Sequence, residues 1–237
     1  MSEEATRAEL EAKGRGALSS RCLRRMLGRG QFVWARGGSL RSWTTIAAVA
    51  VGLVIGVAPA SAATNLIKNG SFERPVVPVG SFELFGSGSS FSHWDVLGGP
   101  GNVSVVSGSF TQNGFSFPAK GGAQWLDLTG DTDTATVVSQ TVQTTPGEQY
   151  TLSFSVGNVH DPGGVFGTTS TVDVYAGENH LITATNSRGS GSTTMAWKKF
   201  ATTFAAVGST TTLLFQNSDP PNDSANGLDA VKLVPAA

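Results

Sequence analysis

Apolar and polar residues alternate with a period of two along most of the chain after residue 63. In "YTLSFSV", residues 150–156, the aromatic and aliphatic side chains fall on one face and Thr or Ser on the other. "STVDVYAG" and "TTTLLFQN" follow the same pattern. Because successive side chains of a strand point to opposite faces, this pattern predicts β-strands with one buried face.

Turn signals separate these runs, and no stretch shows helical apolar spacing over more than two turns. The signals include Asn69-Gly70, Asn113-Gly114, Pro146-Gly147 and Asn226-Gly227. Short strands at near-regular spacing without helices predict about nine or ten strands in an all-β fold, a jelly-roll β-sandwich. We expect one domain over residues 63–237, with Phe72, Phe154 and Phe215 in its core.

An apolar stretch, Ile46 to Val57, precedes this region and is followed by Ala60-Ser61-Ala62. It has the length of a signal-peptide apolar region, whereas a membrane span needs about 20 apolar residues. With a long basic segment upstream, residues 1–62 are predicted to be a signal peptide cleaved after Ala62, and the domain to be secreted. The alternative is an N-terminal helix that is never cut.

Two further features of the N-terminal segment leave alternatives open. Met26 is an alternative start of translation. Arg24-Arg25 raises a twin-arginine export signal, although the pair lies far from the apolar stretch.

Charge and cysteine content exclude several classes of function. Residues 63–237 carry 7 Lys and Arg against 13 Asp and Glu, a net charge of −6. An acidic domain without a basic stripe is a poor nucleic-acid binder. The only cysteine, Cys22, lies in the predicted signal segment, so the domain has neither a disulfide framework nor a Cys-ligated zinc site.

The two ends of the domain resemble each other. "NLIKNGSFE" places an Asn-Gly turn before Glu73, and "NGLDAVKL" places one before Asp229. Since jelly rolls commonly pair their first and last strands, these two carboxylates are expected to lie close together, where they repel unless neutralised. Arg74 or Lys232 could neutralise them, and a structural Ca²⁺ bound by Glu73 and Asp229 would do so better, with backbone carbonyls completing its oxygen ligands.

An ordered set of motifs resembles a known family over residues 65–234. The motifs are "LIKNGSFE", "HWDV", "LDLTG", "SQTVQTTPGEQYTLSFSVGN" and "NGLDAVKL". Together they resemble the choice-of-anchor C domain family of secreted bacterial proteins, which is related to a plant cell-wall domain of unknown function and to galactose-binding-like carbohydrate-binding modules.

The resemblance implies a galactose-binding-like jelly roll, an extracellular location and a polysaccharide or cell-wall glycan as partner. It also implies a structural calcium ion between the positions of Glu73 and Asp229. Relatives often carry paired aspartates near the end, whereas here Ala230 follows Asp229. The sequence ends in "LVPAA" without a sorting motif, so we expect release from the cell unless a partner holds the protein, and no membrane contact after signal cleavage.

Sugar binding needs flat apolar faces for C–H surfaces and polar groups for hydroxyls. Trp94 and Trp125 are candidate ligand-binding residues, although core packing is the equal alternative for Trp94. Trp197 is expected to pack in the fold. In the glycine-rich loop "GNVHDPGGVFGTTS", His160 and Asp161 are candidates to bond a sugar, with an ordinary loop as the alternative.

The sequence offers little support for catalysis. It has three histidines, no Gly-x-Ser-x-Gly elbow and no His-x-x-x-His pair. A glycosidase needs two carboxylates across a cleft, which the sequence alone does not exclude. The leading hypothesis is a secreted, non-catalytic glycan-binding module. The alternatives are a structural or adhesive extracellular protein that binds another protein, with its tryptophans in the core, and a glycan-active enzyme.

Overall fold

Two six-stranded antiparallel sheets form the domain. The computed structural model describes residues 64–221 and 225–236, so the predicted signal segment 1–62 lies outside the described residues. The first sheet has the strand order β1 (Phe82–Gly86), β4 (Asn102–Ser107), β7 (Gln124–Asp127), β14 (Gly227–Pro235), β9 (Gln149–Asn158), β12 (Ala196–Ala205). The second has the order β11 (Asn179–Asn186), β10 (Ser170–Ala176), β13 (Thr210–Asn217), β8 (Val137–Gln143), β3 (Trp94–Leu97), β2 (Ser90–Phe91).

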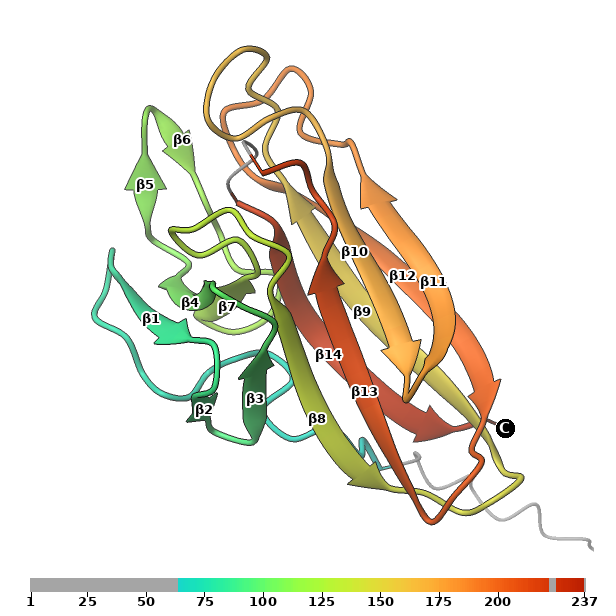
Figure 1. The fold of residues 1–237 in the computed structure, drawn as a ribbon. Coiled ribbons are helices and arrows are strands. Elements are labelled where there is room, and N and C mark those ends of the chain that lie inside the picture. The colour runs from blue at the N-terminus through green and yellow to red at the C-terminus, as the bar shows by residue number, and fades with distance from the viewer. Residues whose placement is uncertain (1–63, 222–224, 237) are drawn as a thin grey trace, which may run out of the picture. The chain divides into compact units, whose positions relative to one another are not determined.

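A small hairpin stands apart from these two sheets. Strands β5 (Thr111–Gln112) and β6 (Phe115–Ser116) pair across the Asn113-Gly114 turn, and Figure 1 shows the hairpin projecting near β4 and β7. The described residues therefore hold 14 strands rather than nine or ten. The excess includes the two-residue strands β2, β5 and β6, which are too short to show alternation.

The chain crosses repeatedly between the two sheets. From β8 onward it alternates from the second sheet to the first, with β10 and β11 as the one consecutive pair in the same sheet. This connectivity is that of a jelly roll, and the predicted all-β jelly-roll β-sandwich is confirmed. Within the described residues no helix is long and apolar enough to cross a membrane.

The main core fills the space between the sheets. Phe72, Phe154 and Phe215 are fully buried there, as predicted. Trp94 joins them, packed 5.3 Å from the ring of Phe72 and 6.0 Å from that of Phe215.

A second apolar cluster covers the opposite face of the first sheet. Adjacent residues of one strand separate into the two clusters: Leu126 lies in the main core, whereas Trp125 lies in the second cluster. The hairpin and the loop between β9 and β10 contribute Phe117 and Phe166 to this cluster. The first sheet is thus buried on both faces around β7, where all four residues are buried.

The two ends of the domain lie against each other, as predicted. The amide of Leu66 donates to the carbonyl of Leu233, and the amide of Val231 donates to that of Gly70. A Cβ atom at position 70 would lie 2.2 Å from the Val231 carbonyl oxygen, so this close approach requires glycine.

Candidate functional site

A hollow of about 180 Å³ opens on the face of the first sheet that carries the second apolar cluster. Strands β4 and β7 contribute Val106 and Trp125 to it. Residues of β1, the hairpin region, the turn after β7 and the β9–β10 loop surround it. The lining residues are Phe82, Ser104, Val106, Phe110, Gln112, Phe117, Trp125, Asp127, Gly130, Asp131, Val165, Phe166 and Ala225.

Aromatic rings form most of its apolar surface. Phe82 and Phe110 meet edge to face with their centroids 5.5 Å apart. The ring of Phe117 stacks on that of Trp125 with their centroids 6.1 Å apart. It meets the ring of Phe166 edge to face at a centroid distance of 5.3 Å. Because Phe82 is 44% exposed, part of this aromatic surface is open to solvent.

Asp127, the last residue of β7, is the buried polar group of the hollow. It is 8% exposed, and its Oδ1 accepts hydrogen bonds from the amide and hydroxyl of Thr129 and from the amide of Asn226. No hydrogen bond from the described part of the chain reaches Oδ2. Burial raises the pKa of Asp127 to about 7 against the lowering effect of the Thr129 and Asn226 hydrogen bonds, and the charge of Asp133 raises it further.

The remaining polar groups of the hollow carry no positive charge. The amide of Asp131 donates to Asn102 Oδ1 at 2.9 Å, and Asn102 Nδ2 donates to the Asp131 carboxylate. Gln112 and Ser104 supply an amide and a hydroxyl. None of the described residues that line the hollow is Lys, Arg or His. The hollow can therefore offer aromatic contacts, hydrogen bonds and negative charge.

Both candidate ligand-binding tryptophans, Trp94 and Trp125, are buried, which for Trp94 is the core-packing alternative. Trp94 is 0% exposed because its indole fills the core between the sheets and donates through Nε1 to the Asn69 carbonyl. Trp125 is 1% exposed because the Phe117 segment covers it and accepts from its Nε1 at 3.0 Å. Trp125 still lines the hollow, whereas Trp94 belongs to the core alone. Trp197 packs, as expected, with its Nε1 donating to Pro118.

His160 and Asp161 do not line the hollow. Their loop folds back on itself: the amide of Asp161 donates to the Gly167 carbonyl at 2.6 Å, and His160 Nδ1 lies 3.4 Å from the Thr168 carbonyl. The same loop reaches the hollow through Val165 and Phe166 instead. A role for His160 and Asp161 in sugar binding stays a prediction.

Glu73 and Asp229 hold the two ends of one loop, residues 120–124. Glu73 accepts hydrogen bonds from the amides of Ala123 and Gln124 at 3.0–3.1 Å. Asp229 Oδ2 accepts from the amides of Lys120 and Gly121 at 2.8 and 2.9 Å.

Asp229 is fully buried, and both this burial and the charge of Glu73 change its pKa. Burial raises its pKa to about 7 against the lowering effect of the amide hydrogen bonds, and the charge of Glu73 raises it further. The two carboxylates therefore interact, as the sequence predicted.

These contacts do not fit a calcium ion as they stand. Ca²⁺ takes six to eight oxygen ligands, whereas Glu73 and Asp229 face backbone N–H groups, which a cation would have to displace. Among the described residues no group of three or more His, Cys, Asp or Glu is placed to hold a metal. The amides stabilise the two carboxylates without an ion, and the calcium site stays a prediction.

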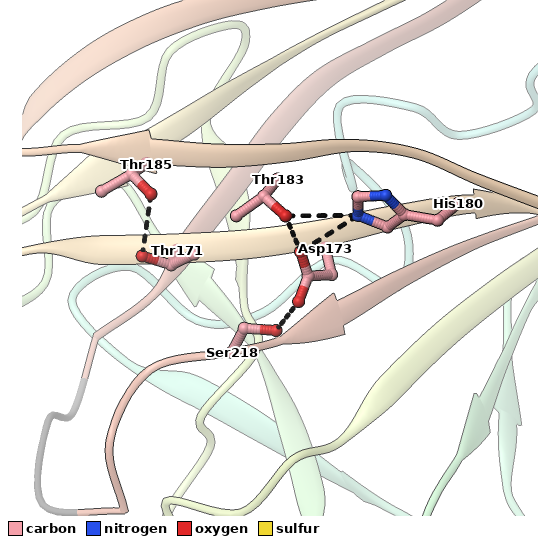
Figure 2. Close-up of polar contacts among 6 residues, drawn as sticks. All are labelled: Thr171, Asp173, His180, Thr183, Thr185 and Ser218. Atoms are coloured by element: carbon pink, nitrogen blue, oxygen red, sulfur yellow. Dashed lines mark hydrogen bonds and ion pairs between the residues drawn. The ribbon is translucent and has the colours of Figure 1, made fainter. Parts of the chain in front are cut away.

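A polar cluster on the other sheet resembles a catalytic arrangement but lacks its connectivity. Figure 2 shows Asp173 at its centre: Ser218 donates to its Oδ2 at 2.6 Å, and His180 Nε2 lies 3.3 Å from its Oδ1. Thr183 donates to the same Oδ1 and lies 3.2 Å from His180 Nε2.

In a hydrolase triad the histidine lies between nucleophile and carboxylate, each bound by a different ring nitrogen. Here Asp173 lies between Ser218 and His180, and one histidine nitrogen faces both Asp173 and Thr183. Burial raises the pKa of Asp173, but hydrogen bonds from Ser218, Thr183 and His180, together with the charge of His180, outweigh it and lower the pKa. The cluster is a hydrogen-bonded surface network, in line with the Thr171–Thr185 pair beside it.

A family model described as "Protein of unknown function (DUF642)" matches residues 65–233. The chain belongs to this family. The matched DUF642 region runs from the segment paired with β14 to Leu233 within β14, and so covers both sheets and the hollow. The predicted relationship to a domain of unknown function is confirmed at this level, and membership of the choice-of-anchor C group stays a prediction.

The DUF642 domain is also similar to solved carbohydrate-binding modules. The CBM22-1 xylan-binding domain of Xyn10C from Paenibacillus barcinonensis is 18% identical, with a TM-score of 0.45 over 75% of this chain and 99% of that one. TmCBM61 in complex with β-1,4-galactotriose is 16% identical, with a TM-score of 0.40 over 73% of this chain and 100% of that one. A family 35 carbohydrate-binding module from Clostridium thermocellum is 11% identical, with a TM-score of 0.40 over 66% of this chain and 99% of that one.

Proposed function

We propose that this DUF642 protein is a secreted, non-catalytic carbohydrate-binding module that binds glycan in the hollow beside β4 and β7. One observation carries the proposal: an aromatic-lined hollow holds the buried carboxylate of Asp127, one oxygen of which has no partner in the described residues. Carbohydrate sites combine apolar faces for the C–H surface of a sugar with a few fixed polar groups for its hydroxyls. The hollow supplies both.

The arrangement of the carboxylates supports binding without catalysis. Glycosidases place two carboxyl groups on opposite sides of the scissile bond. In this hollow Asp127 and Asp131 come from the end of β7 and the turn directly after it, and none of the other described lining residues carries a carboxylate. The carboxylate of Asp131 is also hydrogen-bonded by Asn102.

Secretion and attachment rest on the sequence. The apolar stretch 46–57, followed by Ala60-Ser61-Ala62, supports export with cleavage after Ala62. The resemblance to choice-of-anchor C domains supports action at the cell wall or in the surrounding matrix.

The proposal predicts that the protein is retained on at least one insoluble polysaccharide and that Phe82→Ala weakens the retention at least tenfold. Phe82 and Leu84 lie on the same strand with matching exposure, 44% and 40%, but of the two only Phe82 lines the hollow. The measurement is depletion from solution over xylan, cellulose, β-1,4-galactan and isolated cell walls. Leu84→Ala is the matched control and is expected to bind like the wild type.

If Phe82→Ala and Leu84→Ala weaken retention equally, the binding surface lies elsewhere on β1 and not in the hollow. No retention on any of these materials would favour the structural or adhesive alternative, in which the protein binds another protein. One observation favours that alternative: it expects the tryptophans in the core, and Trp94 and Trp125 are buried.

The calcium site has a separate test. A ligand that binds only the folded state raises stability, by about 2.7 kcal/mol at a hundredfold excess over Kd. The predicted site requires a higher melting temperature in calcium than in chelator, and the difference should disappear in Glu73→Gln. Equal melting temperatures would mean that the amide hydrogen bonds hold Glu73 and Asp229 and that no ion binds there.

A further inference from the structure

We propose that the hollow receives one neutral sugar ring at the end of a chain, and that Asp127 makes it reject uronic acids. This inference rests on the proposed function and names the ligand class of the same site.

The size of the hollow limits what it can hold. Ligand pockets that bury drug-sized molecules measure about 300–1,000 Å³, whereas this hollow measures about 180 Å³. That space suits a single sugar ring rather than a stretch of polysaccharide.

The surroundings of the hollow indicate a chain end rather than the middle of a chain. Its floor is formed by β4, β7 and Phe117. Residues of further segments line the hollow as well: Phe82 of β1, Gln112 of the hairpin, Asp131 of the turn after β7, Val165 of the β9–β10 loop and Ala225 before β14. A polysaccharide lying across the site would need a groove that is open at two ends, whereas a lining drawn from this many segments is typical of a pocket. A pocket suits the terminal ring of a chain.

The charge of the hollow selects the kind of ring. Among the described residues that line it, Asp127 and Asp131 are the ionisable ones, and no basic residue balances them. A uronate carboxylate would be buried among aromatic rings next to like charge, which is costly unless a cation pairs with it. A neutral ring avoids this cost.

Asp127 also offers the ligand a hydrogen-bond acceptor that is held in a fixed position. Its Oδ1 already accepts three hydrogen bonds, which fix the carboxyl group in place. Oδ2 belongs to a residue nine-tenths buried and accepts no hydrogen bond from the described residues. A sugar hydroxyl that bonds to Oδ2 would take the place of solvent at this oxygen, and a site with such a fixed acceptor discriminates against ligands that cannot make the bond.

The first test is the dependence of affinity on chain length. Isothermal titration would compare the monosaccharide, disaccharide and hexasaccharide series of xylan, cellulose and β-1,4-galactan. For the series that binds, we expect Kd values within about tenfold from one ring to six, a difference of about 1.4 kcal/mol. A rise in affinity of a hundredfold or more with length would overturn end recognition while leaving the proposed function intact. Failure of all three series to bind would overturn both.

The second test concerns selectivity, with galacturonic acid and its hexamer as the charged probes. The wild type is expected to bind them at least tenfold more weakly than the neutral sugar that fits. Asp127→Asn keeps the Oδ1 acceptor. We expect this variant to bind the neutral sugar at least tenfold more weakly. We also expect a smaller difference between its affinities for the neutral sugar and for galacturonic acid. Glu178→Gln removes a charge at the exposed turn after β10, outside the hollow, and should change neither. Unchanged selectivity in Asp127→Asn would contradict the role of Asp127.

Discussion

Trp94→Ala is expected to lower the free energy of unfolding by about 3–5 kcal/mol, the range for removal of a large aromatic side chain from a core. Trp94 is 0% exposed and packs against Phe72 and Phe215 between the two sheets. The substitution also leaves the Asn69 carbonyl without the indole donor. Because Asn69 lies in the segment paired with β14, loosening there also affects the closure of the domain.

Urea denaturation followed by far-ultraviolet circular dichroism measures this loss. Trp94→Phe keeps most of the apolar volume but not the hydrogen bond, so a loss of about 1–2 kcal/mol is expected. Val207→Ala, at an exposed turn, serves as the neutral control. A loss below 1 kcal/mol in Trp94→Ala would mean that the indole is not the core residue described above.

The second large effect is a pH dependence of stability that Asp127→Asn reduces. The pKa of Asp127 is raised from 3.8 to about 7 in the folded state. The folded chain therefore keeps a proton that the unfolded chain has lost, and stability falls as pH rises from about 4 through 7. The expected loss is on the order of 2–4 kcal/mol for this group, at about 1.4 kcal/mol for each unit of pKa shift. The pKa of Asp229 is raised in the same direction, so this residue adds to the decrease of stability with rising pH.

Asp127→Asn should be more stable than the wild type at pH 8 and should show a shallower slope between pH 5 and pH 8. The amide retains the Oδ1 acceptor and places Nδ2 where Oδ2 has no partner in the described residues. Urea midpoints at pH 5, 6, 7 and 8 measure the slope. Asp173 is a suitable control because its pKa is lowered, so its contribution is lost only as pH falls below the range tested. Identical slopes in wild type and Asp127→Asn would contradict the account.

The alternation of side chains was sufficient to predict the sandwich and its central residues. It assigned Phe154 and Phe215 to the buried face, and the similarity of the two chain ends placed Glu73 near Asp229. Alternation shows which side of a strand a residue faces but not whether another segment covers that side. Trp125 faces away from the main core and was a candidate for exposure to a ligand, yet the segment containing Phe117 covers it.

The residues of the hollow were harder to predict than the fold. Phe110, Phe115 and Phe117 around the Asn113-Gly114 turn were a readable sign of a hairpin with an aromatic face. Their contact with β7 depends on long-range packing that periodicity does not record. Likewise, no pattern near Glu73 shows that its partners are the amides of a loop about fifty residues away.

The most direct test of the carbohydrate-binding hollow is a ¹H–¹⁵N NMR titration of the protein with xylan, cellulose and β-1,4-galactan oligosaccharides. The account predicts that the oligosaccharide that binds shifts the resonances of residues around the hollow, including the Trp125 indole and the amides of Val106, Asp127 and Phe166. Shifts confined to the outer face of the second sheet, around Thr171 and Asp173, or no shifts with any of the three sugars, would contradict it.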